Sequence, residues 1–214
     1  MAGINAATSP LSQSDTWDLV SPGYTEILLP VFTAYAKDAL AALALPPEAQ
    51  ILDVATGPGT LPLLAAPKVA QVTAIDFSPA MVKVAREQVK TQGLSNVEVH
   101  LEDGQRLPFD NRSFDAAFSL FGLIFFPDRA QGLDELFRVL KPGGTLLVAD
   151  LAAHDRAELL SRYAHRWPGF DDAALAGWLG EAQCAIAATH DLPGPLPVRL
   201  WVAERLPAHQ FNAA

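Results

Sequence analysis

The chain has 214 residues, of which 50% are hydrophobic and 18% charged, with 17 prolines and 14 glycines. This composition excludes a disordered or collagen-like chain and fits a globular domain with a sizeable core. The 24 acidic residues outnumber the 15 basic ones, which gives a formal net charge of −9. We therefore expect neither nucleic acid nor an anionic membrane surface as a partner.

The chain has one cysteine, Cys184, which excludes an internal disulfide and a multi-cysteine metal site and fits a reducing cytoplasm. Its first residues lack the basic start and the apolar run of a signal peptide. No segment reaches the roughly 18 apolar residues that a membrane-spanning helix needs. The expectation is a cytoplasmic protein, whose oligomeric state the sequence leaves open.

An arm and two helices are predicted before the first strand. Residues 1–15 are typical of a loose arm, after which Ser21 can cap a short helix. Pro30 is expected to interrupt that helix, and an alanine-rich helix follows to about Leu45. Residues 1–48 thus form an N-terminal arm and helical cap in this interpretation.

Short apolar runs rich in β-branched residues then alternate with helical patterns, which predicts a parallel sheet with helices on both faces. The predicted strands are 51–55, 72–76, 97–101, 114–120 and 144–150. The predicted helices cover about 60–66 and start at Ser78 and at Asp128, where each side chain can cap its helix. One apolar face is expected on each capped helix, from Val82, Ala85 and Val89 and from Leu133, Leu136, Phe137 and Leu140.

After Asp150 the pattern changes to two helices, at about 155–166 and 171–183. Two apolar runs follow, at 184–192 and 198–206, and the short connection between them predicts an antiparallel hairpin. We expect one domain over residues 1–214, with a cofactor-binding core at 49–150 and C-terminal helices and a hairpin at 151–214.

A glycine-rich turn follows the first predicted strand, and Asp53 stands near the end of that strand. Gly57 and Gly59 stand where the backbone turns into a helix, so a ligand could approach the main chain and the helix N-terminus closely. A plain tight turn is the alternative. A dinucleotide-binding loop is disfavoured because Pro62 stands where the third glycine or alanine of that motif belongs.

Four ordered motifs resemble the class I S-adenosylmethionine-dependent methyltransferases, and the resemblance covers about residues 15–204. They are D-x-A-x-G-x-G at 53–59, VTAIDFSPAMV, LEDGQRLPFDNRSFDAAFS and ELFRVLKPGGTLLVAD. The resemblance implies an α/β fold with a Rossmann-like, doubly wound, mostly parallel sheet of seven strands, a C-terminal antiparallel hairpin and an N-terminal helical cap. The family's usual first glycine is Ala55 here, as in the methyltransferases of ubiquinone and menaquinone biosynthesis.

The resemblance also implies S-adenosylmethionine as cofactor and a role for the end of each of the first four strands. Those segments hold the methionine loop (Asp53, Ala55, Gly57, Gly59), the ribose-binding acid with its adenine contacts (Asp76, Phe77, Met81), the acceptor for the adenine amino group and its neighbours (Asp103, Gly104, Gln105), and backbone for the amino-acid end (Ser119, Leu120). Read without the resemblance, any single one of these aspartates could instead be a helix cap or a solvated turn.

The acceptor is inferred by elimination. After the fourth strand the chain reads Ser119-Leu120-Phe121-Gly122, not the Pro-Pro-aromatic motif of enzymes that methylate amino groups of bases or glutamine amides. Leu151 stands where catechol-type relatives place a metal-binding asparagine, and the cysteines of arsenic-methylating relatives are missing. The expectation is a small, largely apolar or aromatic acceptor without a metal.

Candidate acceptor-binding residues are Trp17, Tyr24 and Phe121, whereas Phe125 and Phe126 are interpreted as core. No catalytic residue is assigned. His154 and His165 are weak candidates that could share a helix face, but about 16 Å along the axis separates them, so they could not chelate one metal together. Besides methyl transfer, two functions stay open: a sulfonium-assisted cyclisation or decarboxylation, and a cofactor-binding regulatory module.

Overall fold

The computed structural model describes residues 12–18, 29–155, 169–181, 184–194 and 196–205. The helix predicted from Ser21 lies outside these ranges, as does all but the first residue of the helix predicted at 155–166. The same holds for the candidate residues Tyr24 and His165.

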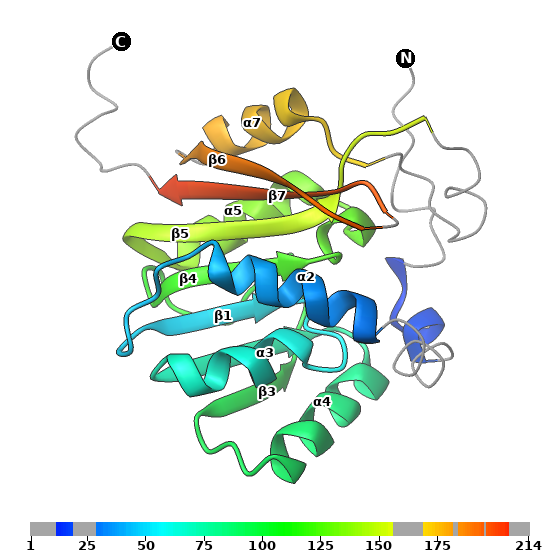
Figure 1. Ribbon diagram of the computed structural model, residues 1–214, viewed down its shortest axis with the longest axis vertical. Coiled ribbons are helices and arrows are strands. Elements are labelled where there is room, and N and C mark those ends of the chain that lie inside the picture. Colours follow the sequence, from blue (N-terminus) through cyan, green and yellow to red (C-terminus); the bar gives the residue numbers. More distant parts are fainter. Residues whose placement is uncertain (1–11, 19–28, 156–168, 182–183, 195, 206–214) are drawn as a thin grey trace.

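A seven-stranded sheet forms the centre of the molecule, with the strand order β3-β2-β1-β4-β5-β7-β6 (Figure 1). The first five strands are parallel, and β7 pairs antiparallel with both β5 and β6. The predicted Rossmann-like sheet with its antiparallel C-terminal hairpin is therefore confirmed. The strands are β1 (Gln50–Val54), β2 (Gln71–Asp76), β3 (Val97–Leu101), β4 (Phe114–Leu120), β5 (Leu140–Leu151), β6 (Cys184–Leu192) and β7 (Val198–Arg205).

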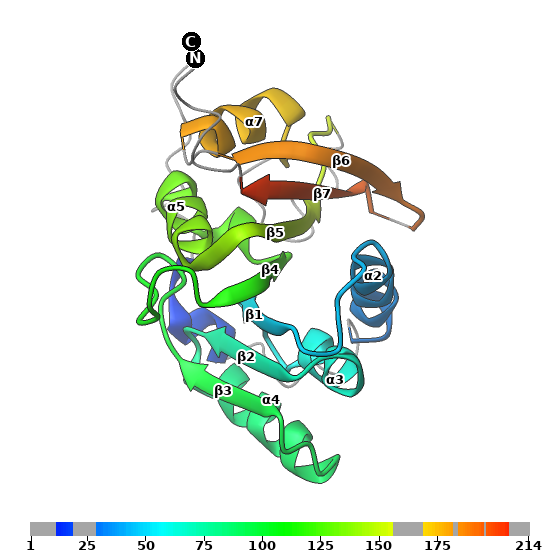
Figure 2. The ribbon, with the colours of Figure 1, turned by 90° about the vertical axis from the view of Figure 1, so that its left-hand side faces the viewer.

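Helices cover both faces of the sheet, as the alternation of elements predicted (Figure 2). One face packs against α2 (Leu29–Ala41), α3 (Thr60–Ala65) and α4 (Pro79–Thr91), and the other against α5 (Arg129–Val139) and α7 (Asp172–Glu181). Short 3-10 helices follow α3 and β4: η3 (Ala66–Lys68) and η4 (Leu123–Phe125). The two apolar clusters lie on opposite faces, and neighbouring strand residues such as Ile51 and Leu52 belong to different clusters.

Both predicted helix caps are present. The Ser78 hydroxyl accepts a hydrogen bond from the backbone N–H of Met81 at 3.2 Å, and the Asp128 carboxylate accepts one from Gln131 at 3.0 Å. Each cap satisfies an N–H that has no partner within its helix. Helices α4 and α5 therefore begin where the sequence predicted.

Three boundaries differ from the prediction. Pro30 lies in the first turn of α2, where its missing N–H costs no hydrogen bond, and α2 ends at Ala41 rather than near Leu45. The helix that Pro30 was expected to interrupt lies outside the described residues. A helical turn covers residues 14–18, part of which was expected to be a loose arm. β5 begins at Leu140 because that residue already pairs with Phe114, ahead of a register shift in the β4–β5 pairing.

Among the residues that the structure describes, no helix has the length and apolar character needed to cross a membrane.

Candidate functional site

A cavity of about 320 Å³ lies at the sheet edge where the parallel strands end. Open α/β sheets bind ligands at this edge, where the strand order reverses, here between β1 and β4. Most of the candidate residues line this one cavity: Trp17, Ala55, Gly57, Asp76, Phe77, Met81, Asp103, Gly104, Gln105, Leu120 and Phe121.

The two glycines of the loop after β1 have different tasks. Both adopt a left-handed backbone, with φ 54° at Gly57 and 88° at Gly59. A Cβ on Gly57 would meet no atom within 4 Å, whereas one on Gly59 would lie 3.2 Å from the Cβ of Ala85 in α4. Gly57 therefore leaves space toward the cavity, and Gly59, which does not line it, lets α3 and α4 pack closely.

Ala55, at the position of the family's usual glycine, also has a left-handed backbone, with φ 60°. This conformation costs a non-glycine residue roughly 1–2 kcal/mol. Its methyl group occupies the space beside Gly122, since a Cβ on Gly122 would clash with it. The loop thus keeps the glycine-type backbone, and the extra methyl group is accommodated by a glycine after β4.

Asp76, at the end of β2, joins two segments of the site. One carboxylate oxygen accepts the N–H of Gly57 at 2.8 Å and the other accepts the N–H of Ser78 at 2.9 Å. Burial raises the pKa of Asp76 to about 6, and these backbone donors oppose the shift. Because each oxygen can accept a further bond, the carboxylate can also bind ligand hydroxyls.

Asp53 lies behind the glycine loop and is 2% exposed. Burial raises its pKa to about 7, and the nearby charge of Asp76 acts in the same direction. Asp53 lines not the main cavity but a smaller one of about 50 Å³, together with Thr56 and Thr60. Ala55, Gly57, Leu120 and Phe121 border both cavities.

The loop after β3 brings an exposed carboxylate to the main cavity. Asp103 accepts the N–H of Gln105 at 2.9 Å, which fixes the turn. The side-chain oxygen of Gln105 accepts the N–H of Asp128 at 2.8 Å, and its backbone oxygen accepts the amide of Gln131 at 2.9 Å. Gln105 therefore attaches this loop to the start of α5 as well as lining the cavity.

The loop after β4 contains a second strained residue, Phe121, with φ 57°. Bulky side chains rarely adopt this conformation, and such strain is often stored at functional sites. The Phe121 ring packs on Phe32 and Tyr35 of α2, with centroid distances of 4.5 and 5.4 Å. Ser119 is fully buried and does not line the cavity, whereas Leu120 does.

Phe125 and Phe126, interpreted from the sequence as core, pack against the core and also line the cavity. Phe126 occupies a slot between Gly104 and Gly132, where a Cβ on either glycine would clash with its ring. Phe125 meets Trp17 edge to face at 5.0 Å. The apolar wall is therefore larger than the sequence indicated.

Sequence reasoning missed Asp18, which holds the helical turn at 14–18 against α4. Its carboxylate accepts the Ser78 hydroxyl at 2.6 Å and the N–H of Ala80 at 3.1 Å. This contact places Trp17 at the cavity. Asp18 and Ser78 are 60 residues apart, and no motif in the sequence signals their pairing.

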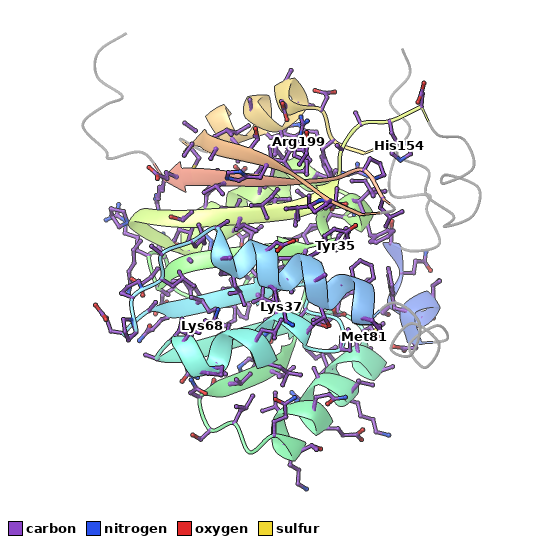
Figure 3. The ribbon with its side chains drawn as sticks, viewed as in Figure 1. Tyr35, Lys37, Lys68, Met81, His154 and Arg199 are labelled. Carbon is purple, nitrogen blue, oxygen red and sulfur yellow. The ribbon has the colours of Figure 1, made fainter. Side chains whose placement is uncertain are left out.

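The described histidine candidate, His154, does not line the main cavity. Figure 3 shows it on the segment after β5, separated from Met81, which lies on α4 at the cavity. Within the described ranges, no group of three or more histidine, cysteine or acidic side chains is placed to hold a metal ion.

Residues 51–144 match the family model described as a methyltransferase domain. The chain is 35% identical over 141 residues to a demethylmenaquinone methyltransferase of Listeria welshimeri, which covers 63% of this chain and 60% of that protein. A protein of the same name from Bacteroides fragilis is 42% identical over 110 residues, covering 50% of this chain and 45% of its own length. The chain thus spans about three-fifths or less of these relatives.

Among solved structures, the cyclase SpnF superposes with a TM-score of 0.79 at 19% identity, covering 90% of this chain and 94% of SpnF. At this identity the likeness concerns the fold. The matched domain includes the glycine loop, Asp76 and Asp103, which surround one cavity here. Residues 51–144 therefore form a methyltransferase domain similar to those of the class I S-adenosylmethionine-dependent methyltransferases, a family whose cofactor is S-adenosylmethionine.

Proposed function

We propose that this chain transfers the methyl group of S-adenosylmethionine to a small, largely apolar or aromatic acceptor of the reduced-quinone kind. One observation carries the proposal: Asp76 and the aromatic side chains of Trp17, Phe121 and Phe125 line a single cavity. A cofactor bound through Asp76 would therefore share that cavity with an apolar acceptor. The names of the relatives support a quinone-type acceptor.

The residues present fit the cofactor. The Asp76 carboxylate would accept the ribose hydroxyls with the lone pairs that its two backbone donors leave free. The open space at Gly57 would admit the ligand against the main chain. Asp103, exposed at the cavity rim, would accept the adenine amino group, and the Leu120 backbone would contact the amino-acid end.

When bound, the cofactor supplies an electrophilic methyl group on a positively charged sulfur. The protein's part is to align the acceptor for a direct displacement and to exclude water. The faces of Trp17, Phe121 and Phe125 can do both, because aromatic rings pack on an aromatic acceptor and attract a cation. The carboxylates of Asp76 and Asp103 favour the positively charged cofactor over its neutral product.

The test is an incubation of the purified protein with S-adenosylmethionine and a short-chain demethylmenaquinol analogue, followed by mass spectrometry. The expected result is an acceptor heavier by one methylene unit and an equal amount of S-adenosylhomocysteine. Phe121→Ala and Trp17→Ala should lower kcat/KM while S-adenosylhomocysteine still binds. Turnover of the acceptor without cofactor consumption would favour the cyclase alternative, and efficient methylation of DNA, RNA or intact protein would contradict the small-molecule proposal.

A further inference from the structure

A buried pair of opposite charges lies beneath the aromatic wall of the cavity. Asp150, at the end of β5, is 0% exposed, and Arg129, the first residue of α5, is 8% exposed. Neither lines the cavity. Burying two charges costs more free energy than burying apolar residues of similar size, so the fold alone does not call for this pair.

The two side chains bind the backbone of one residue, Ile124. Its N–H donates to Asp150 at 3.1 Å, and its carbonyl oxygen accepts from the Arg129 guanidinium at 2.8 Å. Asp150 also accepts the N–H of Leu151 at 2.8 Å, which orients the carboxylate. The guanidinium lies 6.0 Å from the centroid of the Phe170 ring. We call Asp150 and Arg129 the Ile124 clamp.

Ile124 is the central residue of η4, and this short helix carries the apolar wall. Phe125 directly follows Ile124 and meets Trp17, while Phe121 and Gly122 directly precede η4. A 3-10 helix of three residues has few hydrogen bonds of its own. Besides the packing of the buried side chains of Leu123 and Ile124, the two bonds of the Ile124 clamp therefore hold η4 in place.

We propose that Asp150 and Arg129 are positioning residues, which fix η4 and so determine how an acceptor fits against Phe121, Phe125 and Trp17. The inference rests on the proposed function for the acceptor, but the placement of η4 can be measured without one. The Ile124 clamp therefore affects the position of the apolar wall and leaves the cofactor contacts of Asp76 unchanged.

A second clamp of the same design provides a matched control. Glu135 accepts the N–H of Leu107 at 2.7 Å, and Arg138 donates to the carbonyl oxygen of Leu107 at 2.8 Å. Leu107 is buried and does not line the cavity. Glu135→Gln therefore disturbs a similar pair of backbone hydrogen bonds at Leu107, in a different loop.

The experiment compares the wild type, Asp150→Asn, the double variant Asp150→Asn with Arg129→Met, and Glu135→Gln. The double variant removes both charges together, because Asp150→Asn alone removes the Asp150 charge beside the buried Arg129 guanidinium and could prevent folding. Fluorine NMR of fluorotryptophan-labelled protein, with the Trp17 signal assigned through Trp17→Phe, reports the position of η4 through the Phe125 contact. Calorimetry measures S-adenosylhomocysteine affinity.

We expect the Trp17 signal to move or broaden in the double variant and to stay in place in Glu135→Gln. The cofactor product should bind the double variant with an affinity within about twofold of the wild type. With the demethylmenaquinol analogue, KM should rise roughly tenfold, since small misplacements of a binding wall are costly. An unchanged Trp17 signal in the double variant, or an equal change in Glu135→Gln, would overturn the clamp. If the analogue is not methylated by the wild type, the proposed function fails, and the NMR comparison still decides the clamp.

Discussion

Lowering the pH should weaken cofactor binding through Asp76. In the proposed function the ribose hydroxyls need the ionised carboxylate of Asp76 as acceptor, and burial raises the pKa of this group in the free protein to about 6. At about pH 7 most molecules carry the carboxylate, whereas at about pH 5, one unit below the pKa, only about one in eleven does. Binding must then expel a proton, so the affinity at pH 5 should be about tenfold lower than at pH 7.

Isothermal titration with S-adenosylhomocysteine at several pH values, in wild type and Asp76→Asn, isolates this effect. The asparagine amide would face the N–H of either Gly57 or Ser78, donor against donor, and it removes the charge. We expect Asp76→Asn to bind about tenfold to a hundredfold more weakly at pH 7. Asp53 titrates in the same range, and Asp76→Asn lowers the pKa of Asp53 by removing a nearby charge, so both proteins are compared in an Asp53→Asn background, where the difference reports Asp76.

Repeating the titration near pH 6 in buffers with different ionisation enthalpies should reveal about half a proton more released by the wild type than by the variant. The reasoning is refuted if the wild type binds equally well at pH 5 and pH 7, or if Asp76→Asn keeps the full pH dependence. A variant that fails to fold is recognised by circular dichroism.

Three further outcomes follow from the backbone and the buried charges. Gly57→Val should abolish cofactor binding in calorimetry, because the valine side chain would fill the open space at this position. Tm should fall by only about 2–8 °C, the cost of holding a β-branched residue at a left-handed φ. Global unfolding of the variant would instead show that Gly57 is needed for the fold. Gly122→Ala should lower the urea midpoint, and Ala55→Gly should restore it by removing the clashing methyl group; additive effects in the double-mutant cycle would contradict this pairing. Because burial raises the pKa of Asp53, the folded state binds more protons than the unfolded one between about pH 4 and pH 7, so stability should fall as pH rises through this window. Differential scanning fluorimetry should show Tm falling from pH 5 to pH 8, with a smaller fall in Asp53→Asn.

Local signals made much of the fold predictable. Ser78 and Asp128 cap their helices through bonds to residues three positions on, and each strand is a short apolar run, so neighbouring residues suffice to identify them. The order of acids at successive strand ends likewise indicated the cavity that Asp76 and Asp103 line. These features depend on sequence neighbours and on the rule that parallel strands end at one edge.

The features of the site that the sequence did not predict depend on contacts between residues that are far apart in the chain. Asp18 binds the start of α4 across 60 residues, and Gln105 holds the N–H of Asp128. The pattern around Phe125 fits a core residue equally well, because its ring both packs on the core and faces the cavity. The Ile124 clamp combines residues from β5 and α5, which only the folded sheet brings together.

The slot that holds Phe126 bears on how the acceptor range could evolve. Gly132 lies inside α5 and does not line the cavity, yet a single methyl group added there would collide with the Phe126 ring, which does. A mutation that never touches the ligand could thus displace a wall of the pocket. Replacing Gly132 or Gly104 by a larger residue would require a smaller side chain than phenylalanine at position 126. Homologues in which all three residues are replaced would therefore have a differently shaped pocket on the same sheet.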